Sequence, residues 1–403
     1  MTELSPLGDV IESMQPGFAT GKQDEAGILQ VRMNNISPNG GWDWSKRRYV
    51  PATETQIDKL SLVSGDVLFN CTNSPAMVGK SAYFTGADER VLFSNHFYRI
   101  RVSESKLDPS YLTRSLRWHF ERGTFRSMCN AWVNQATVRR DDLQKLKVPL
   151  PPLPEQRRIA AILDKADALR AKRREAIAKL DQLLQSVFLD MFGDPVTNPK
   201  GWPTARAGEV FSEFVGGKNV ACPDESGSPY RILKVSAVTR KTYLPHESKP
   251  APSDFSPPAS TLVQAGDLLF SRANTSELVA ATAYVWSTPK NMVLPDKLWK
   301  LILGSNQDVD VMYIWELFKN ESFRRDLAKT ASGTSGSMKN ISKSKLRQVT
   351  LLMPPFEIQE KFGKICRTIH AQIKLLADAE AKAEKTFVSL QQRAFSGQLS
   401  EAA

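Results

Sequence analysis

The chain has 403 residues, 41% of them apolar and 24% charged, a composition that excludes a disordered or collagenous protein. At roughly 150 residues per domain, this length predicts two to three domains. Lysine and arginine exceed aspartate and glutamate by 11 charges, so we expect a polyanionic partner, nucleic acid first and an anionic membrane second. Apolar runs are far shorter than the roughly 18 residues that span a bilayer, and the N-terminus lacks the pattern of a signal peptide. We therefore expect a cytoplasmic protein without disulfides, whose four scattered cysteines are buried thiols.

The first half of the chain predicts a globule followed by one long helix. Residues 1–150 read as short β-rich segments broken by Gly, Pro, Asn and Asp, with a helical patch at 111–122. From 155 to 192 there is neither glycine nor proline, and apolar residues follow the 3,4 alternation of a coiled-coil seam. Gly193 and Pro195 then predict the end of the helix.

The second half predicts the same order of elements. Residues 196–350 form a second mixed globule with a helical patch at 312–327, and a second long helix runs from about 357 to 395. Each helix is too long for one domain of 150 residues. We therefore expect the two helices to pack antiparallel, with the globules at opposite ends.

Sequence repeats predict a duplication. The segment GDVLFN (65–70) recurs as GDLLFS (266–271), and ILQV (28–31) recurs as ILKV (232–235), each about 200 residues later. Each half also ends in a Pro-Pro pair followed by a glutamine, Gln156 or Gln359. The fold class that we predict is α+β, with two pseudo-two-fold related globules separated by two long antiparallel coiled-coil helices. Its four segments are 1–150, 151–195, 196–350 and 351–403.

Fragments of catalytic motifs fail at the residue that the chemistry needs. The Gly79-Lys80-Ser81 run lacks the first glycine of a phosphate-binding loop. The run Met353 to Phe356 places a weakly accepting thioether where amino-methyltransferases need Asn or Asp. The four histidines are far apart in the sequence and form no metal-binding pair. We predict no catalytic residue and no metal site.

The cations of the globules are the predicted DNA contacts. Lysine and arginine neutralise phosphates, while Arg, Asn and Gln can also read base edges. Our candidates in the two globules are Lys46, Arg47, Arg48, Asn73, Arg139 and Arg140, and Arg240, Lys241, Arg272, Asn274, Lys339 and Lys343.

The order of motifs resembles one known family. PLPPLPEQRRIAAIL (149–163), FGDP (192–195) and the degraded copy MPPFEIQEKFGKI (353–365) are similar to the specificity subunits of type I restriction-modification systems, as is the loop GTSGSMKNIS (333–342). The resemblance implies that each globule is a target recognition domain that reads one half of a bipartite, asymmetric site in double-stranded DNA.

The same resemblance implies partners and leaves the chain itself non-catalytic. Its helices would dock two copies of the modification subunit, which bind S-adenosylmethionine and methylate adenine, and a restriction subunit would supply ATP- and magnesium-dependent translocation and cleavage. The candidate residues for this docking are Gln156, Ile159, Ile162, Leu169, Leu180, Gln359, Ile365, Ile369 and Leu376. The second copy has Glu357 and Ile358 where the first has Pro154 and Glu155, so the two ends would dock unequally.

Three alternatives stay open at the level of the sequence. The chain could be a stand-alone DNA-modifying or DNA-cleaving enzyme, which the purified chain alone would reveal by acting on DNA. It could be the specificity subunit of a related bipartite-site restriction system. A coiled-coil scaffold without DNA specificity would bind every duplex equally.

Overall fold

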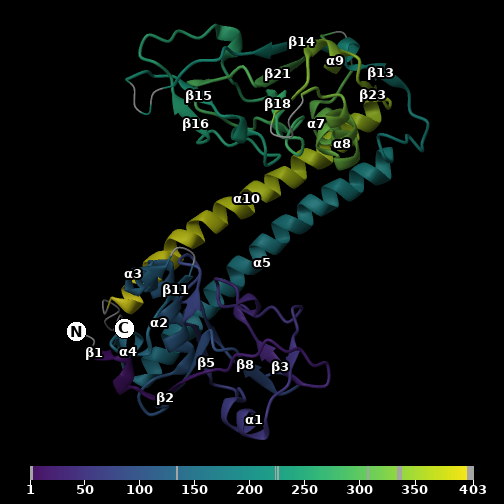
Figure 1. Ribbon diagram of the computed structural model, residues 1–403. Helices are drawn as coiled ribbons and strands as arrows, with labels where there is room; N and C mark the ends of the chain where they lie inside the picture. The colour runs from purple at the N-terminus through teal and green to yellow at the C-terminus, as the bar shows by residue number, and fades with distance from the viewer. Residues whose placement is uncertain are drawn as a thin grey trace. The chain divides into compact units, whose positions relative to one another are not determined.

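The computed structural model describes residues 3–132, 135–222, 224, 227–305, 308–333 and 338–396. The chain divides into two compact units, Met1–Arg174 with Asp378–Ala403, and Glu175–Ala377. Each unit holds one globule and part of both long helices, α5 (Leu153–Phe192) and α10 (Phe356–Phe395) (Figure 1). This division assigns each helix part to a globule, whereas the division drawn from the sequence treats the helices as separate segments.

Both globules are built on the same four-stranded antiparallel sheet. In the first the order is β2-β9-β5-β7, and in the second it is β14-β21-β17-β19. The strands are β2 (Ile11–Pro16), β9 (Phe97–Val102), β5 (Val67–Asn70), β7 (Ser81–Tyr83), β14 (Phe211–Gly216), β21 (Leu298–Leu303), β17 (Leu268–Ser271) and β19 (Thr282–Tyr284). The pairing register shifts at the same place in β2 and β14, between Ile11 and Ser13 and between Phe211 and Glu213. The duplication predicted from the repeats is therefore present in the fold.

The smaller elements repeat as well. In each globule a three-stranded sheet has a central strand that is antiparallel to one neighbour and parallel to the other. These sheets are β4 (Tyr49–Val50), β3 (Ile28–Val31) and β8 (Val91–Phe93), and β16 (Ser248–Pro250), β15 (Arg231–Leu233) and β20 (Met292–Val293). Short ladders complete them: β1 (Leu4–Pro6) with β12 (Lys147–Pro149), β13 (Thr204–Arg206) with β23 (Thr350–Leu352), β10 (Asn130–Trp132) with β11 (Gln135–Thr137) and β6 (Thr72–Asn73), and β18 (Ala273–Asn274) with β22 (Lys339–Asn340).

The short helices follow the same plan. They are α1 (Glu54–Leu60), α2 (Pro109–Glu121), α3 (Thr124–Met128) and α4 (Arg140–Gln144) in the first globule, and α6 (Ala207–Val210), α7 (Val311–Lys319), α8 (Glu321–Lys329) and α9 (Lys343–Arg347) in the second. Single 3-10 turns lie at Leu7–Asp9, Met33–Asn35, Val235–Ala237 and Ala259–Thr261. The helical patch predicted at 312–327 is two helices, because Asn320 leaves the helical conformation and its side chain caps α8 at Phe323 N, 3.2 Å away.

Burial on both faces explains the unbroken apolar runs of the central strands. Val67 and Phe69 of β5 pack into the core that contains α2, while Leu68 packs into the core of the smaller sheet. Leu268 and Leu269 of β17 divide between two cores in the same way. Successive strand residues point to opposite faces, so a strand that is covered on both sides needs apolar residues at every position.

A buried glutamine joins each globule to its long helix. The Asp108 side chain caps α2 at Ser110 N and Tyr111 N, both 3.0 Å away, and Gln156 Oε1 accepts the Asp108 N–H at 2.9 Å. Gln156 Nε2 donates to the carbonyl oxygens of Lys106 and Pro151, each at 2.9 Å. In the second unit Gln359 Oε1 accepts the Asp310 N–H at 3.2 Å and Gln359 Nε2 donates to Pro354 O at 2.7 Å.

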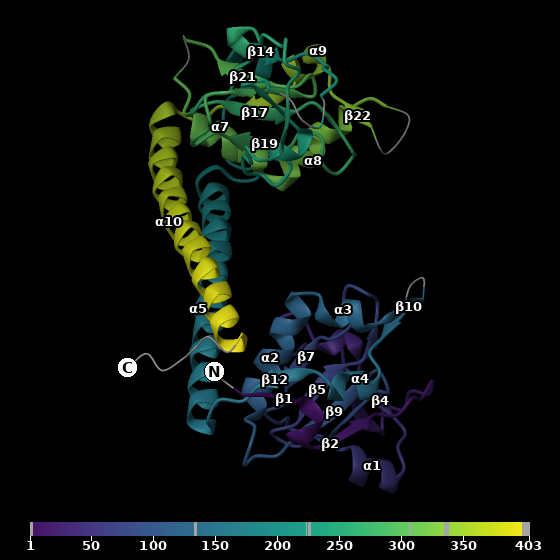
Figure 2. The same cartoon turned by 90° about the vertical axis from the view of Figure 1, so that its left-hand side faces the viewer.

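The long helices run antiparallel within each unit, as the apolar seams predict. In the first unit Arg170 pairs with Glu384 and its guanidinium lies 4.4 Å from the centre of the Phe387 ring, while Arg174 pairs with Glu380 at 2.5 Å. In the second unit Phe192 of α5 lies 5.4 Å from Phe362 of α10. Figure 2 shows the two helices side by side. Among the described residues, no helix combines the length and the apolar character needed to cross a membrane.

We expect Gln359→Ala to destabilise the second unit, because it leaves the buried Asp310 N–H and Pro354 carbonyl without partners. An unsatisfied buried polar group costs about 1–3 kcal/mol. Urea unfolding followed by fluorescence would measure the change. The exposed Gln372→Ala on the same helix is the control and should change stability by less than about 0.5 kcal/mol. Equal effects of the two substitutions would contradict this role of Gln359.

Candidate nucleic-acid interface

The loop that carries three of the predicted DNA contacts is held rigidly in the first globule. Asn35 is 2% exposed, and its Nδ2 donates to the carbonyl oxygens of Asp43 and Lys46, each at 3.0 Å. The Trp42 and Trp44 rings stack 4.9 Å apart within the same loop. The backbone that leads to Lys46, Arg47 and Arg48 is therefore positioned by buried contacts.

The three cations of this loop differ in what neutralises them. Lys46 Nζ lies 3.0 Å from an Asp43 carboxylate oxygen, and Arg47 Nη1 lies 3.0 Å from Glu89 Oε1. Arg48 instead donates from Nη2 to the carbonyl oxygens of Gly21 and Lys22, at 3.1 and 3.3 Å. Arg48 has no carboxylate partner in the part of the chain that the structure describes.

Arg48 lines a groove of about 500 Å³, which we call the first-globule groove. Its lining also includes Phe18, Ala19, Thr20, Gly21, Gln30, Arg32, Met33, Asn34, Ser94, Asn95 and His96. Burial and the charge of Arg48 lower the pKa of the Arg32 guanidinium. The Nε atoms of both arginines are buried without a hydrogen-bond partner among the described residues. Two neighbouring cations that line one groove are suited to bind an anion such as a DNA phosphate.

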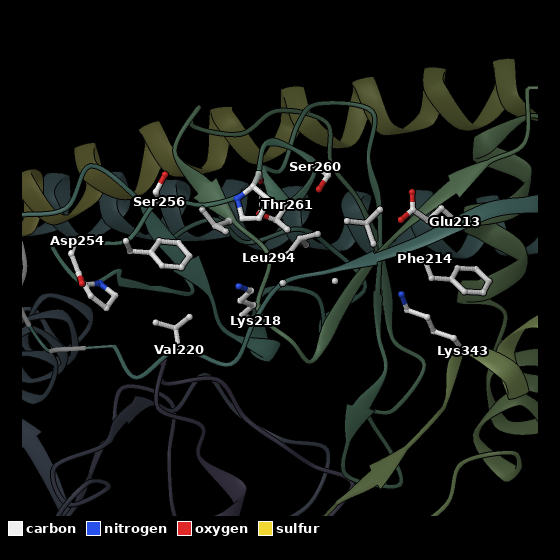
Figure 3. Close-up of a pocket in the computed structure, with 17 residues that line it drawn as sticks. Glu213, Phe214, Lys218, Val220, Asp254, Ser256, Ser260, Thr261, Leu294 and Lys343 are labelled. Carbon is white, nitrogen blue, oxygen red and sulfur yellow. Dashed lines mark hydrogen bonds between the residues drawn. The ribbon is translucent and has the colours of Figure 1, made fainter.

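The second globule has a hollow of about 670 Å³, which we call the second-globule hollow. Lys218 and Lys343 extend into it from different segments, and Ser260 and Thr261 add hydroxyl groups (Figure 3). Its other lining residues are Glu213, Phe214, Val215, Gly216, Gly217, Val220, Pro252, Asp254, Phe255, Ser256, Pro258, Val293 and Leu294. The hollow thus combines cations, carboxylates and hydroxyl groups, a mixture that can contact both phosphates and base edges.

The groove and the hollow occupy matching places in the two copies. Phe18 of the groove follows β2, and Ser94 follows β8. Gly217 of the hollow follows β14, and Leu294 follows β20. The two cavities thus share these segments of the frame, but their cations stand at different places: Arg32 follows β3 and Arg48 precedes β4, whereas Lys218 follows β14 and Lys343 begins α9.

Both predicted asparagines, Asn73 and Asn274, bind the backbone. Asn73 Oδ1 accepts the Ser74 N–H at 2.8 Å, and Asn274 Oδ1 accepts the Thr275 N–H at 2.9 Å. Asn73 Nδ2 also donates to Asn70 Oδ1 at 2.6 Å. Both side-chain oxygens are used in the same turn of the two copies, a role that the sequence analysis did not foresee.

Arg272 is also engaged inside the second globule. Its guanidinium donates to the Asp296 carbonyl at 2.5 Å, the Asp296 carboxylate at 3.2 Å and Asn340 Oδ1 at 2.8 Å. Lys339, which pairs with Asn274 across the β18–β22 ladder, donates from Nζ to Gly333 O at 2.8 Å. Within the loop 333–342 that resembles the family, residues 334–337 lie outside the described residues.

The remaining cation candidates lie apart from the groove and the hollow. Arg139 and Arg140 are exposed at the start of α4, and Arg240 is exposed in a turn. Lys241, in a left-handed conformation with φ of 62°, lines a different cavity together with Leu189 of α5 and Glu316 of α7. The structure therefore does not bring Lys241 together with Lys343.

Two cations of these sites escaped the sequence analysis. Arg32 and Lys218 stand outside charge clusters, so composition did not single them out. Arg32 does follow the repeated ILQV segment directly, and Lys218 follows the Gly-Gly pair at the end of β14. The repeat boundaries were the signal that could have pointed to them.

The helix candidates divide into buried and exposed groups. Gln156, Gln359, Ile159 and Ile369 are at most 8% exposed, because they pack within their own units. These four are unsuited to the partner contacts for which they were selected. Ile162, Leu169 and Ile365 are 39%, 46% and 38% exposed, while Leu180 and Leu376 are half-buried.

The Gly79-Lys80-Ser81 run, which resembles part of a phosphate-binding loop, has a structural role. Lys80 is 4% exposed, and its ammonium donates to the carbonyl oxygens of Met33 and Ile36 at 2.8 and 2.6 Å. Burial lowers the pKa of this ammonium. Lys80 thereby fixes the turn that contains Asn35 and precedes the cationic loop.

Comparisons with known proteins agree with this architecture. Residues 2–179 match the family model of the type I restriction modification DNA specificity domain. A protein of Methanocaldococcus jannaschii that carries the name type I restriction enzyme MjaX specificity subunit is 31% identical over 215 residues, which span 53% of this chain and 50% of that protein. The match thus spans half the length of this relative.

Two longer matches cover both halves. The EcoKI specificity subunit of Escherichia coli K12 is 24% identical over 403 residues, covering 92% of this chain and 82% of that protein. The crystal structure of the S subunit of a type I restriction-modification system from M. genitalium has the same fold, with a TM-score of 0.61 at 13% identity over 98% of this chain and 96% of that one. Residues 2–179 thus carry the type I restriction modification DNA specificity domain, and the chain as a whole is similar to type I restriction enzyme specificity subunits.

Proposed function

We propose that the chain is the non-catalytic DNA-specificity subunit of a type I restriction-modification complex, with each globule reading one half of a bipartite, asymmetric site. One observation carries this proposal: each copy of one frame holds a cavity bordered by the segments that follow matching strands, and the two cavities are lined by different cations. A duplicated frame supports the same approach to DNA in both copies. Different side chains on that frame would recognise different bases.

The partners of this function follow from the same proposal. Two modification subunits would bind S-adenosylmethionine and methylate adenine, and a restriction subunit would use ATP and magnesium. Ile162, Leu169 and Ile365 are the helix residues that we assign to docking, because they are large, apolar and exposed in their units. A complex that acts on chromosomal DNA would work in the cytoplasm.

Exchange of one globule tests whether each globule reads its half-site independently of the other. Residues 1–150 are replaced by the corresponding part of a relative that keeps an aspartate at position 108 and an arginine at position 114, so that contacts to α5 are preserved. Methylation-aware sequencing of cells that also carry the modification subunit should show one altered half-site and one unchanged half-site. A motif altered in both halves, or no sequence motif at all, would refute independent reading.

Arg47 and Arg48 should differ in their effect on DNA binding. Arg48→Ala removes a cation of the first-globule groove that has no carboxylate partner among the described residues, so it should weaken binding and lower the slope of log K against log salt by about 1 if Arg48 contacts phosphate. Loss of discrimination at one base position, at about 1–3 kcal/mol, would indicate base reading instead. Titrations of labelled duplex into the assembled methyltransferase at several salt concentrations measure both effects.

Arg47→Ala is the matched control for this pair. Arg47 is next to Arg48 but is neutralised by Glu89, so its loss should change the affinity and the salt slope less. A larger effect of Arg47→Ala than of Arg48→Ala would show that the groove is not the contact surface.

Helix length provides a further test, since the chain passes between the units twice and is helical both times, at Arg174–Glu175 and at Ala377–Asp378. Four residues inserted at both points add close to one turn, about 6 Å, and preserve the helix pairs within each unit. At about 3.4 Å per base pair, the spacer of the methylation motif should grow by one or two base pairs. Alanine substitutions at the same points, without insertion, should leave the spacer unchanged. An unchanged spacer in an active insertion variant would contradict a role of the helices in spacing.

A further inference from the structure

The junction between globule and long helix is held by permanent charges in the first unit. Arg114 and Arg117 of α2 both pair with Asp167 of α5. The Asp167 side chain is 19% exposed, and despite its burial the two arginines lower its pKa. Opposite charges with several hydrogen bonds satisfy one another at this depth.

The matching positions of the second unit carry a different set of side chains. The two junctions can be aligned on their capping aspartates, Asp108 and Asp310, and on their glutamines, Gln156 and Gln359. Counted from the two aspartates, Glu316 and Lys319 stand where the first unit has Arg114 and Arg117. Counted from the two glutamines, Cys366 and His370 stand where the first unit has Leu163 and Asp167. The ion pairs of Asp167 with arginine are thus replaced by a carboxylate, a thiol and an imidazole that meet at one place.

These three groups lie close together in the second unit. Each of Glu316, Cys366 and His370 offers one atom that could bind a metal ion, and these three atoms lie within 4.8 Å of one another. The side chains of Glu316 and His370 are 3% and 11% exposed, and Cys366 is fully buried. Cys366 and His370 are four residues apart on α10 and therefore project from the same face of the helix.

One buried nitrogen atom in this cluster has no hydrogen-bond partner among the described residues. His370 Nε2 is buried, lies 3.7 Å from Glu316 Oε1 and has no hydrogen-bond partner among the described residues. The rings of Trp315 and Trp286 pack against the imidazole, with centroids 4.7 and 5.2 Å away. A buried polar atom without a partner is costly unless a bound group satisfies it.

We propose that Glu316, Cys366 and His370 bind a divalent metal ion, zinc by preference, that ties α10 to α7. Thiolate, imidazole and carboxylate are the ligands that zinc takes, at about 2.0–2.3 Å. A tetrahedral ion with such bonds holds its ligand atoms roughly 3.3–3.8 Å apart, so the widest pair must close by at most about 1.5 Å. A fourth position is left for water.

Lys319 shares the carboxylate with this ion. Lys319 Nζ lies 2.6 Å from Glu316 Oε1 and 4.4 Å from the centre of the Trp315 ring. A carboxylate has two oxygens, so Glu316 can serve the lysine with one and the metal with the other. Zinc binds cysteine as the thiolate, so metal binding releases the proton of the Cys366 thiol to solvent.

Cobalt substitution tests the site directly. The full-length chain, stripped with a chelator and titrated with Co²⁺, should develop a thiolate-to-metal charge-transfer band that saturates at one equivalent per chain, and Zn²⁺ should displace it. Metal analysis of the protein as purified should find zinc in the same ratio. Absence of both the band and stoichiometric zinc in the wild-type chain would overturn the proposal without reliance on any variant.

Substitutions then assign the ligands. Cys366→Ala and His370→Ala should lose the band and the bound zinc, whereas Cys129→Ala and His246→Ala in other parts of the chain should retain both. A band that persists in Cys366→Ala, or disappears equally in Cys129→Ala, would place the metal elsewhere and refute the assignment. Circular dichroism of each variant confirms that a lost band reflects a lost ligand and not a lost fold.

Discussion

The structure depends on how each globule is held to a long helix. A helix of 40 residues has no interior of its own, so its apolar residues must be covered by a globule or by another helix. Gln156 and Gln359 make this attachment specific through hydrogen bonds of their buried side-chain amides. Each amide binds the residue that caps the neighbouring globule helix, α2 or α7, and a carbonyl oxygen of the proline segment before its own helix. The position of each globule on its helix is therefore defined by directional bonds as well as by apolar packing.

The two copies share their backbone frame but differ in the side chains that line their cavities. Sheet order, strand register and the helix attachment are the same, since these depend on backbone pairing and burial. Arg48 and Arg32 line the groove of one copy, and Lys218 and Lys343 line the hollow of the other, because such side chains are carried by loops and element ends that the core does not constrain. A frame of this kind allows the recognition surface to change without loss of the fold.

The two helix junctions show the same separation on a smaller scale. Asp167 is neutralised by arginines that are always charged, whereas His370 and Glu316 meet a thiol at the matching place. Both solutions must satisfy buried polar groups, but they use different chemistry. The second solution leaves an imidazole nitrogen, a potential metal ligand, for which the described residues provide no partner.

The sequence alone determined the duplication, the long helices and the similarity to type I specificity subunits, because local sequence patterns encode these features. The proline-free stretch from 155 predicted α5 to within two residues of its start and with the correct end at Phe192. The repeated GDVLFN segment marked an inner strand of both four-stranded sheets. Only the tertiary structure decided which side chains are available. Arg47 and Arg48 are neighbours of equal charge in the sequence, yet Glu89, 42 residues beyond Arg47, neutralises one of them and not the other. Likewise Glu316 meets Cys366 and His370 only because α7 packs on α10, a contact between distant segments that no local pattern records.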